Sequence, residues 1–445
     1  MIAPGSKGWI NKFFSDFTTD ELRNEVGAPE DISEDEYLHL RLLESGIVFG
    51  FPSGRIFQND INTASWTQQE KLKFLLFESL LFVYLAEHKD EAPTPDSFKA
   101  SLLNFYKNHN SSSITDIFNL FLKESEDDRL EKILSQRIDV KGKIVDSHYW
   151  FNYLSNTFVF LDVILYQSFI REKTLSNEEA ELSLNALMVI AFTAFSNGKA
   201  DENERKLFDH FLASANLSDK QRKFAEDHFQ GEIELSHLMY PKTLSSIYKR
   251  FLMDISALTI FANQTTMPDE LLSFNELCQF LEIPNKEVEN SVALVENFVL
   301  IHNNEIDFLK SSKSYEQVFG SLSKRWMKIL ARNKDKLAIE IKESKELVYL
   351  VRKSTKEDLT EEEKALVKNQ FKDIIKSMPA LAIFMLPGGA LLLPIVLKIL
   401  PDLIPSAFRS NEIEEEFFYS FFYSAKKSLY IFAIALRKQG TKIPP

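Results

Sequence analysis

The chain of 445 residues is too long for a single ordinary core, and about 150 residues per domain suggests roughly three domains. Its composition, 44% hydrophobic and 26% charged, is that of a globular protein and excludes a chain that is disordered or polytopic throughout. The formal net charge of -13 argues against nucleic acid as a partner by direct readout, because such binding needs a concentrated surplus of Lys and Arg. Few glycines and long segments rich in Leu, Phe, Lys and Glu predict an all-α, multi-domain protein.

The chain has one cysteine, Cys278. A single thiol excludes an intramolecular disulfide framework and a zinc site built on several thiolates, and it is typical of reducing compartments. We expect it to be a small buried residue in a helix. The N-terminal sequence MIAPGSKGWINKFFSDF has no uninterrupted apolar segment of the kind that a secretory signal needs. The expected location is therefore the cytoplasm or the cytoplasmic side of the inner membrane.

Residues 1–145 are expected to form an N-terminal helical region. Between Ala64 and His88, apolar residues recur at helical spacing, which predicts one amphipathic helix. The hydroxyl of Ser65 is expected to cap its first turn. A polar run around Ser111 predicts a loop.

A long apolar segment follows from Trp150 to Ile170. As one continuous helix it would be long enough to reach across a bilayer. However, four polar residues interrupt it, and an aspartate near the centre of a span costs about 3 kcal/mol. We therefore expect a buried core helix. The interrupting residues are Asn152, Asn156, Asp162 and Gln167.

The next region, residues 146–305, contains an internal repeat. Two apolar helices are predicted to end at Asn197 and Asn263, and each is followed by a connection, a second helix and a further helix start. The interval of sequence from Asn197 to Ser218 nearly equals that from Asn263 to Asn285. Two such helical hairpin units would bury both apolar faces in one all-helical domain. Capping pairs are predicted at two of these helix starts, Ser218 with Gln221 and Ser273 with Glu276.

The stretch NGKADENE, from Asn197 to Glu204, follows the first apolar helix of this repeat. Together with the second unit at the matching distance, it resembles the tellurite-resistance protein B family, whose domains are called TerB-like. The resemblance implies a helical bundle and divalent-metal binding at acidic positions. The implied candidate ligands are Asn197, Asp201 and Glu204. If the two units face each other, Asp269 and Glu270 of the second loop, MPDE, could supply further oxygen ligands.

A purely structural interpretation of the same stretch is also complete. Asn197 stands where the family usually has an aspartate, which removes one of the charges that bind a hard cation such as calcium. Asn197 and Gly198 can instead end one helix with a left-handed cap, while Asp201 caps the next helix with Glu204 as its third residue. Capping and metal binding remain alternatives, and a divalent metal is the one cofactor considered for this chain.

Residues 306–345 are expected to form a connecting helix rich in Lys and Glu. Its basic run, residues 320–336, is interpreted either as a solvated face or as a contact for acidic lipid head groups. Downstream, Thr360 and Glu363 have the spacing of a capping box, which predicts the start of a helix that leads into an apolar stretch.

That apolar stretch, residues 379–408, contains five prolines. A proline inside a helix costs about 3 kcal/mol in water, and Pro387–Gly389 forms a natural break. One possibility is a helical hairpin with arms of about 10 residues, each long enough for half a bilayer, which re-enters a membrane or is buried in protein. The other is a kinked span over residues 378–400, in which the one charged residue, Lys398, reaches the interface.

LTEEEK at Leu359 and LLPIVLKILPDLIPSAF, which ends at Phe408, resemble the leucine-zipper and EF-hand-containing transmembrane (LETM) family. The resemblance implies that residues 346–445 form a membrane-associated region and contribute to potassium or proton homeostasis. In that family a soluble region downstream of the membrane segment is described as ribosome binding, so a ribosome is a partner by family analogy alone. Combined with the TerB-like region, it resembles bacterial proteins of this relationship that are associated with biofilms. The membrane and family-motif residues are Pro379, Pro387, Gly388, Gly389, Pro394, Lys398, Pro401, Pro405, Ser406 and Phe408.

The sequence contains none of the enzyme signatures HExxH, GxSxG, GxxxxGK[ST] or GxGxxG. We therefore expect a protein that is not an enzyme. The leading hypothesis is a non-enzymatic, membrane-associated scaffold that binds lipid and a protein partner. Two alternatives are a cation-homeostasis factor and a soluble, metal-sensing TerB-like protein.

Overall fold

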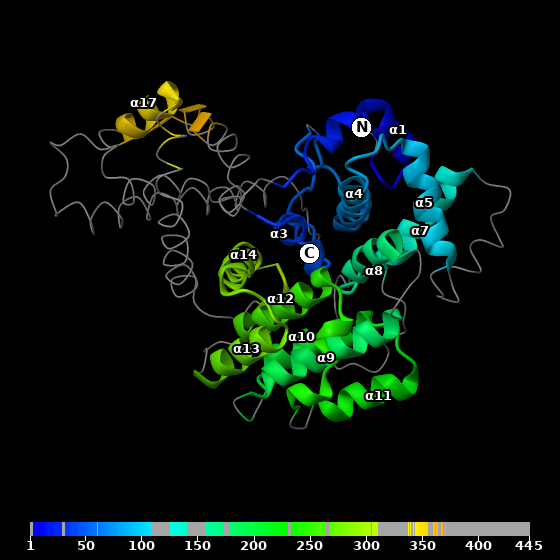
Figure 1. The fold of residues 1–445 in the computed structure, drawn as a ribbon, viewed down its shortest axis with the longest axis vertical. Helices are drawn as coiled ribbons and strands as arrows, with labels where there is room; N and C mark the ends of the chain where they lie inside the picture. Colours follow the sequence, from blue (N-terminus) through cyan, green and yellow to red (C-terminus); the bar gives the residue numbers. More distant parts are fainter. Residues whose placement is uncertain are drawn as a thin grey trace, which may run out of the picture. The chain divides into compact units, whose positions relative to one another are not determined.

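The structure is a computed structural model, and its description covers residues 3–28, 32–59, 61–108, 125–139, 156–172, 178–196, 198, 200–229, 233–262, 268–303 and 305–309, with further positions between 337 and 370. The fold class is all-α, as predicted, and no β-strand occurs among these residues (Figure 1). The chain divides into two compact units, residues 1–319 and residues 320–445.

The first unit contains α1 (Trp9–Asp16), α2 (Thr19–Arg23), α3 (Glu34–Ser45), η1 (Ile47–Phe49), α4 (Gln68–Glu87), α5 (Pro95–Asn108), α7 (Glu126–Ile138) and α8 (Phe160–Glu172). After these come α9 (Glu179–Ala194), α10 (Glu202–Ser214), α11 (Asp219–His228), η2 (Leu235–His237), η3 (Pro241–Thr243), α12 (Ser246–Ala262), α13 (Pro268–Phe280), α14 (Asn285–His302) and η4 (Asp307–Leu309). The second unit contains α17 (Lys345–Ser354).

Helix α4 is the centre of the N-terminal part of the first unit. It packs against α3, α7 and α8, so its buried side chains point in several directions. Trp9 of α1 meets the edges of Phe74 and Phe77 at centroid distances of 5.8 and 5.0 Å. Such T-shaped aromatic pairs add about 0.5–1.5 kcal/mol beyond the area they bury. The N-terminus is therefore anchored in the core by its own aromatic residue.

The predicted helix over residues 64–88 is present, but the predicted cap at Ser65 is wrong. Thr67 caps α4, because its hydroxyl accepts the Glu70 N–H while the Glu70 carboxylate accepts the Thr67 N–H. Ser65 could form the same kind of capping pair with Gln68, three positions later, but the side chain of Gln68 is a neutral amide. A charged carboxylate binds a backbone N–H more strongly than a neutral amide does, so the helix starts at the Thr67 pair.

Helix α8 is a core helix, as predicted, although it starts at Phe160 and residues 151–155 lie outside the described part. Asp162 is fully buried and is held by Arg137 of α7 and by the hydroxyl of Tyr106. Asn156 precedes α8 and donates to the Arg137 carbonyl at 2.7 Å. Within the described part of the chain, no helix is both long and apolar enough to cross a bilayer.

The sequence repeat corresponds to two units of three helices, α9–α11 and α12–α14 (Figure 1). The first residues of α10 and α13 are separated by the same interval of sequence as the first residues of α11 and α14. Helix α9 packs against α10, α11 and α13, while α12 packs against α13, α14 and α10. Because α9 also packs against α12, these two apolar helices form the shared centre of the repeat. The third helix of each unit, α11 or α14, begins at the further helix start that the sequence predicts.

The two capping pairs predicted within the repeat have different outcomes. Ser218 and Gln221 form the predicted capping box at the start of α11. The predicted cap at Ser273 is wrong, because α13 starts at Pro268 and continues through Ser273. Proline is favoured at a first helical position, since its missing N–H has no partner there in any case.

Helix α3 connects the two halves of the first unit. It packs against α4 on one side and against α12 and α14 on the other. His39 Nε2 lies 2.6 Å from Asp254 of α12, and Ser291 of α14 donates to the same carboxylate. All three side chains are buried. The segments before and after residue 145 thus lie in one compact unit. A domain boundary at residue 145 remains a prediction from the sequence.

In the second unit, α17 buries Leu347 and Leu350. Thr360 and Glu363 make the predicted reciprocal hydrogen bonds, 3.0 Å from the Thr360 N–H to the carboxylate and 3.2 Å from the Glu363 N–H to the hydroxyl. Glu363 also pairs with Lys353 of α17 at 2.6 Å. Residues 371–445, with the predicted hairpin, lie outside the described part.

Candidate functional site

The first acidic loop of the repeat forms a capping box. Asp201 Oδ1 accepts the backbone N–H groups of Asn203 and Glu204 at 2.8 Å each. Glu204 Oε2 accepts the Asp201 N–H at 2.7 Å in return. Gly198 has φ +83°, as a left-handed helix end requires. Asp201 and Glu204 therefore form the helix cap that the structural interpretation of this stretch predicts.

The proposed metal ligands lie only partly within the described residues. Glu204 and Glu270 occupy corresponding positions in the two units, each as the third residue of its helix, and both side chains are fully buried. Asn197 and the side chain of Asp269 fall outside the described part. Where side chains are described, no group of three or more His, Cys, Asp or Glu is arranged to hold a metal ion. Metal binding at this loop remains a prediction.

Cys278 lies in α13 and is buried, as expected. Burial, with a smaller contribution from Asp254, raises the pKa of its thiol to about 12. A thiol with so high a pKa carries almost no reactive thiolate at neutral pH. Cys278 therefore has the properties of a small core residue.

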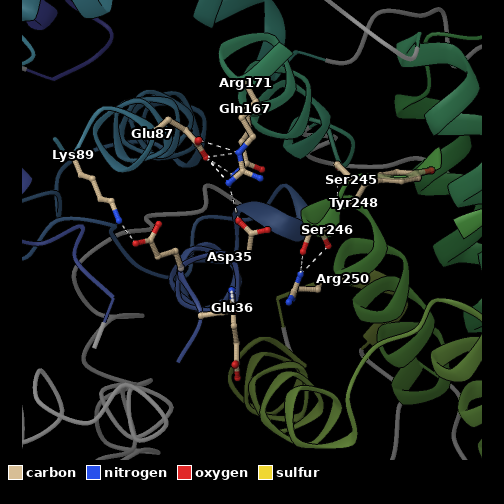
Figure 2. A network of polar contacts seen from close by, with 12 residues as sticks. Asp35, Glu36, Glu87, Lys89, Gln167, Arg171, Ser245, Ser246, Tyr248 and Arg250 are labelled. Atoms are coloured by element: carbon tan, nitrogen blue, oxygen red, sulfur yellow. Dashed lines mark hydrogen bonds and ion pairs between the residues drawn. The ribbon is translucent and has the colours of Figure 1, made fainter. Parts of the chain in front are cut away.

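A polar network joins α3, α4 and α8 (Figure 2). Arg171 Nε lies 2.9 Å from both carboxylate oxygens of Glu87, and its Nη2 lies 2.8 Å from Asp35. Gln167 donates to Glu87 at 2.8 Å. Because the Arg171 side chain is 42% exposed, solvent screens these charges and each pair adds little stability. The network therefore connects three helices, α3, α4 and α8.

A second part of this network joins α12 to α14 and α3. Arg250 donates to Glu287 at 2.6 and 2.9 Å and to the Ser246 carbonyl at 3.1 Å. Glu36 accepts from Asn290 at 3.1 Å. Burial and the nearby Glu287 charge raise the pKa of Glu36. These contacts connect α12 to α14 and α3 to α14.

A pocket of about 140 Å³ lies between the loop that follows η1 and helix α4. Arg55 binds the fully buried Glu78 through two guanidinium nitrogens and stacks over Phe74 with its central carbon 5.0 Å from the ring centre. Burial raises the pKa of Glu78 and the Arg55 charge opposes that shift. The residues that line the pocket are Pro52, Ser53, Gly54, Arg55, Thr63, Trp66, Lys71, Phe74, Leu75 and Glu78.

Ser53 connects this pocket to the end of α14. Its Oγ lies 2.7 Å from His302 Nε2, and His302 Nδ1 lies 3.1 Å from Glu305 Oε2. Sequence analysis did not identify these residues, since Ser53 and His302 are 249 positions apart and neither belongs to a known motif. No local sequence signal could have found the pair.

The C-terminal segment is similar to known proteins. Residues 359–437 match the family described as "LETM1-like, RBD". Over 79 residues, the chain is 35% identical to the LETM1 domain-containing protein YLH47, mitochondrial, of Saccharomyces cerevisiae. The alignment covers 18% of this chain and 17% of the yeast protein, so the chain matches less than a fifth of that relative's length. No solved structure matches the chain.

The predicted relation to LETM proteins is therefore confirmed for residues 359–437. This segment contains all the predicted motif residues from Pro379 to Phe408, whose side chains lie outside the described part. The TerB-like domain, the bacterial origin and the biofilm association remain predictions from the sequence.

Proposed function

We propose that this chain is a membrane-associated scaffold, in which the LETM-related segment contacts the lipid bilayer and the helical unit of residues 1–319 binds a protein partner. The observation that carries the proposal is the overlap of the family match at residues 359–437 with the apolar stretch at residues 379–408. The segment with the lowest cost of entering lipid is thus the one related to LETM proteins.

The composition of this stretch supports contact with lipid. Residues 378–400 contain one charged side chain, Lys398, which lies near the end of the run. A long lysine side chain at the end of an apolar segment can reach the head-group region, which reduces the cost of burying the remainder. The prolines favour a kinked or re-entrant path over a straight helix.

Ribosome contact is a second candidate function, favoured by one specific observation. The resemblance to the LETM family implies ribosome contact, and the match to the family described as "LETM1-like, RBD" covers residues 359–437. Contact between residues 359–437 and a ribosome would be compatible with membrane association, because both would tether the chain to a larger assembly. Cation homeostasis and metal sensing remain predictions from the sequence, with no observation in the described residues that favours either.

Fractionation of the full chain tests the proposal. We expect the protein to sediment with membranes at high speed, to resist extraction by salt and to enter the supernatant only with detergent. Complete recovery in the supernatant without detergent would remove the membrane role. Co-sedimentation with purified ribosomes, in the absence of membranes, tests the second candidate separately, and a chain that stays at the top of the gradient would exclude it.

A further inference from the structure

The hydrogen-bond chain from Ser53 through His302 to Glu305 leads from the pocket to the surface. It brings a hydroxyl, an imidazole and a carboxylate together in the order that activates a serine. Ser53 is partly exposed and lines the pocket, whereas His302 is buried. We infer that Ser53 is an activated nucleophile that accepts a short acyl group, with His302 as its general base and Glu305 as the residue that positions His302.

The tautomer of His302 follows from its two partners. The hydrogen bond from His302 lowers the pKa of Glu305, so this carboxyl is ionised at neutral pH and can only accept. The proton between them therefore belongs to His302 Nδ1. In a neutral imidazole this leaves Nε2 as an acceptor, so the Ser53 hydroxyl donates to it across 2.7 Å. This is the protonation state that a general base needs before the reaction.

Loop geometry holds Ser53 in place. The backbone N–H groups of Ser53 and Gly54 both donate to the Ser45 carbonyl, at 3.0 and 3.1 Å. Gly46 has φ +82°, and a Cβ there would lie 2.7 Å from Ser53 Oγ and 2.2 Å from the Phe51 carbonyl oxygen. Only a glycine leaves room for the hydroxyl to turn toward α14.

Two aromatic rings fix the imidazole. Phe51 and Phe298 lie 4.6 and 4.9 Å from the His302 ring, centre to centre. They restrict rotation of the ring, so its two nitrogens remain directed at Ser53 and Glu305. Such orientation by neighbouring groups contributes to the reactivity of a general base.

The pocket determines the kind of acyl group. Its volume of about 140 Å³ holds a group of a few heavy atoms, and Trp66, Phe74 and Leu75 supply apolar lining. Lys71 also lines the pocket, and its charge reaches Glu305. Since the N–H groups of Ser53 and Gly54 are already used by Ser45, the Lys71 ammonium is the group that stabilises an oxyanion here. The expected substrate is a short ester such as an acetyl ester.

The reaction is a two-step hydrolysis with water as the second reactant. In the first step, Ser53 Oγ forms a bond to the acyl carbon and its proton passes to His302 Nε2. The bond between the acyl carbon and the ester oxygen breaks, and the alcohol leaves with that proton. In the second step, water attacks the acyl-serine and gives a proton to Nε2. The Oγ–carbon bond breaks, Oγ takes the proton back and the acid is released.

A biotinylated fluorophosphonate tests the inference on the full chain. Attack by Ser53 would form an Oγ–phosphorus bond and release fluoride, and mass spectrometry would locate the adduct. We expect labelling of the wild type at Ser53 and at least a 100-fold slower reaction for folded His302→Gln, because a general base contributes about 10²–10⁴-fold. Hydrolysis of p-nitrophenyl acetate should fall to the background rate in Ser53→Ala.

Ser97 provides the matched control. It is an exposed serine whose hydroxyl contacts Tyr84 and Thr94 and no imidazole in the described structure, so Ser97→Ala should label like the wild type. Glu305 is half-exposed at the surface, so Glu305→Gln should fold normally. Labelling of Ser53 should be slower in Glu305→Gln, and Glu305→Asp should retain part of the wild-type rate. Absence of an adduct at Ser53 while trypsin in the same tube is labelled would overturn the inference. Equal labelling rates for the wild type and Glu305→Gln would show that Glu305 does not position His302.

The inference is independent of the membrane proposal. It concerns the unit of residues 1–319, and the fluorophosphonate reaction can be measured in detergent or in its absence. A positive result would overturn the expectation from sequence that the chain is not an enzyme.

Discussion

Arg137 and Asp162 form a bidentate ion pair in the interior of the first unit. Nε of Arg137 lies 2.8 and 3.0 Å from the two carboxylate oxygens, and Nη2 lies 2.5 Å from one of them. The exposed fractions of the two side chains are 3% and 0%. Tyr106 donates to the same carboxylate, and Glu179 accepts from the same guanidinium. This pair explains how an apolar core helix can contain a buried central aspartate.

Replacing Asp162 with Ala should reduce the free energy of unfolding by about 3–5 kcal/mol. The substitution leaves the buried Arg137 charge with only Glu179 to compensate it, and a buried charge that has lost its partner is costly. Urea unfolding followed by circular dichroism measures the loss. Asp16→Ala breaks the pair with Lys12 on α1, where the lysine side chain is 47% exposed and solvent screens the charges, and should cost far less than Asp162→Ala. Similar losses for both variants would contradict the assigned role of the buried pair.

Two glycines with similar backbone angles should respond differently to the same substitution. Gly46→Ala introduces both an unfavourable φ and contacts of 2.2 and 2.7 Å. Gly198→Ala introduces the unfavourable φ alone, since no atom of the described residues lies within 4 Å of the added Cβ. Left-handed backbone costs an alanine about 1–2 kcal/mol, which is the loss expected for Gly198→Ala. Gly46→Ala should be less stable than Gly198→Ala and should also lose fluorophosphonate labelling at Ser53. Thermal unfolding of both variants provides the comparison.

The buried carboxyl of Glu36 should make stability fall as pH rises. Burial, followed by the Glu287 charge, raises its pKa in the folded state above the ordinary 4.5. In the window from 4.5 up to the raised pKa, the folded state binds more protons than the unfolded state, so the free energy of unfolding decreases with increasing pH. Glu36→Gln should remove this part of the pH dependence, as measured by urea unfolding from pH 4 to pH 8.

Glu21 on α2 provides a control of opposite sign. The Thr18 backbone N–H lowers the pKa of Glu21, so its contribution is present above 4.5 and is lost as pH falls through the folded pKa. Glu21→Gln should therefore change the pH dependence of the free energy of unfolding below pH 4.5. The pH dependence above 4.5, which is assigned to Glu36, should stay the same. If the free energy of unfolding of Glu36→Gln changed with pH in the same way as that of the wild type, Glu36 would have an ordinary pKa.

The capping box at α10 should contribute to stability regardless of metal. Asp201→Ala removes the acceptor for two backbone N–H groups and should cost about 1 kcal/mol, while Asp201→Asn should retain most of the cap. We expect the same loss in EDTA and in calcium. Calorimetric titration with calcium, magnesium, manganese and zinc tests the alternative directly. Binding heat that disappears in Asp201→Asn would support the metal site.

Much of the fold was predictable because its signals are local. Apolar periodicity identifies the helix that contains Leu75, and four interrupting polar residues, Asp162 the most costly among them, distinguish a core helix from a membrane span. The capping box at Asp201 and Glu204 was also visible in the sequence. The errors at Ser65 and Ser273 have different causes. Several residues near the start of α4 can cap it and their competition depends on small energy differences, whereas Ser273 lies inside α13, which starts at Pro268.

The contacts between distant segments were not predictable. Ser53 meets His302 only because η1 and the end of α14 are brought together by the packing of α3 against α14. A sequence without aligned relatives contains no information on such a pairing. The membrane-related motif was identified by resemblance, and the match over residues 359–437 supports that resemblance without locating the side chains.

The most direct test of the membrane proposal is flotation of the full chain with vesicles of anionic and zwitterionic phospholipid. A wild-type chain should rise with the vesicles, and Ala390→Arg, near the middle of residues 378–400, should rise much less, because a central arginine costs about 2.5–3.5 kcal/mol in a bilayer. Ile443→Arg, outside the segment that matches the LETM1-like family, is the matched control and should float like the wild type. A wild-type chain that stays at the bottom of the gradient, or equal flotation of all three proteins, would contradict lipid contact through this stretch.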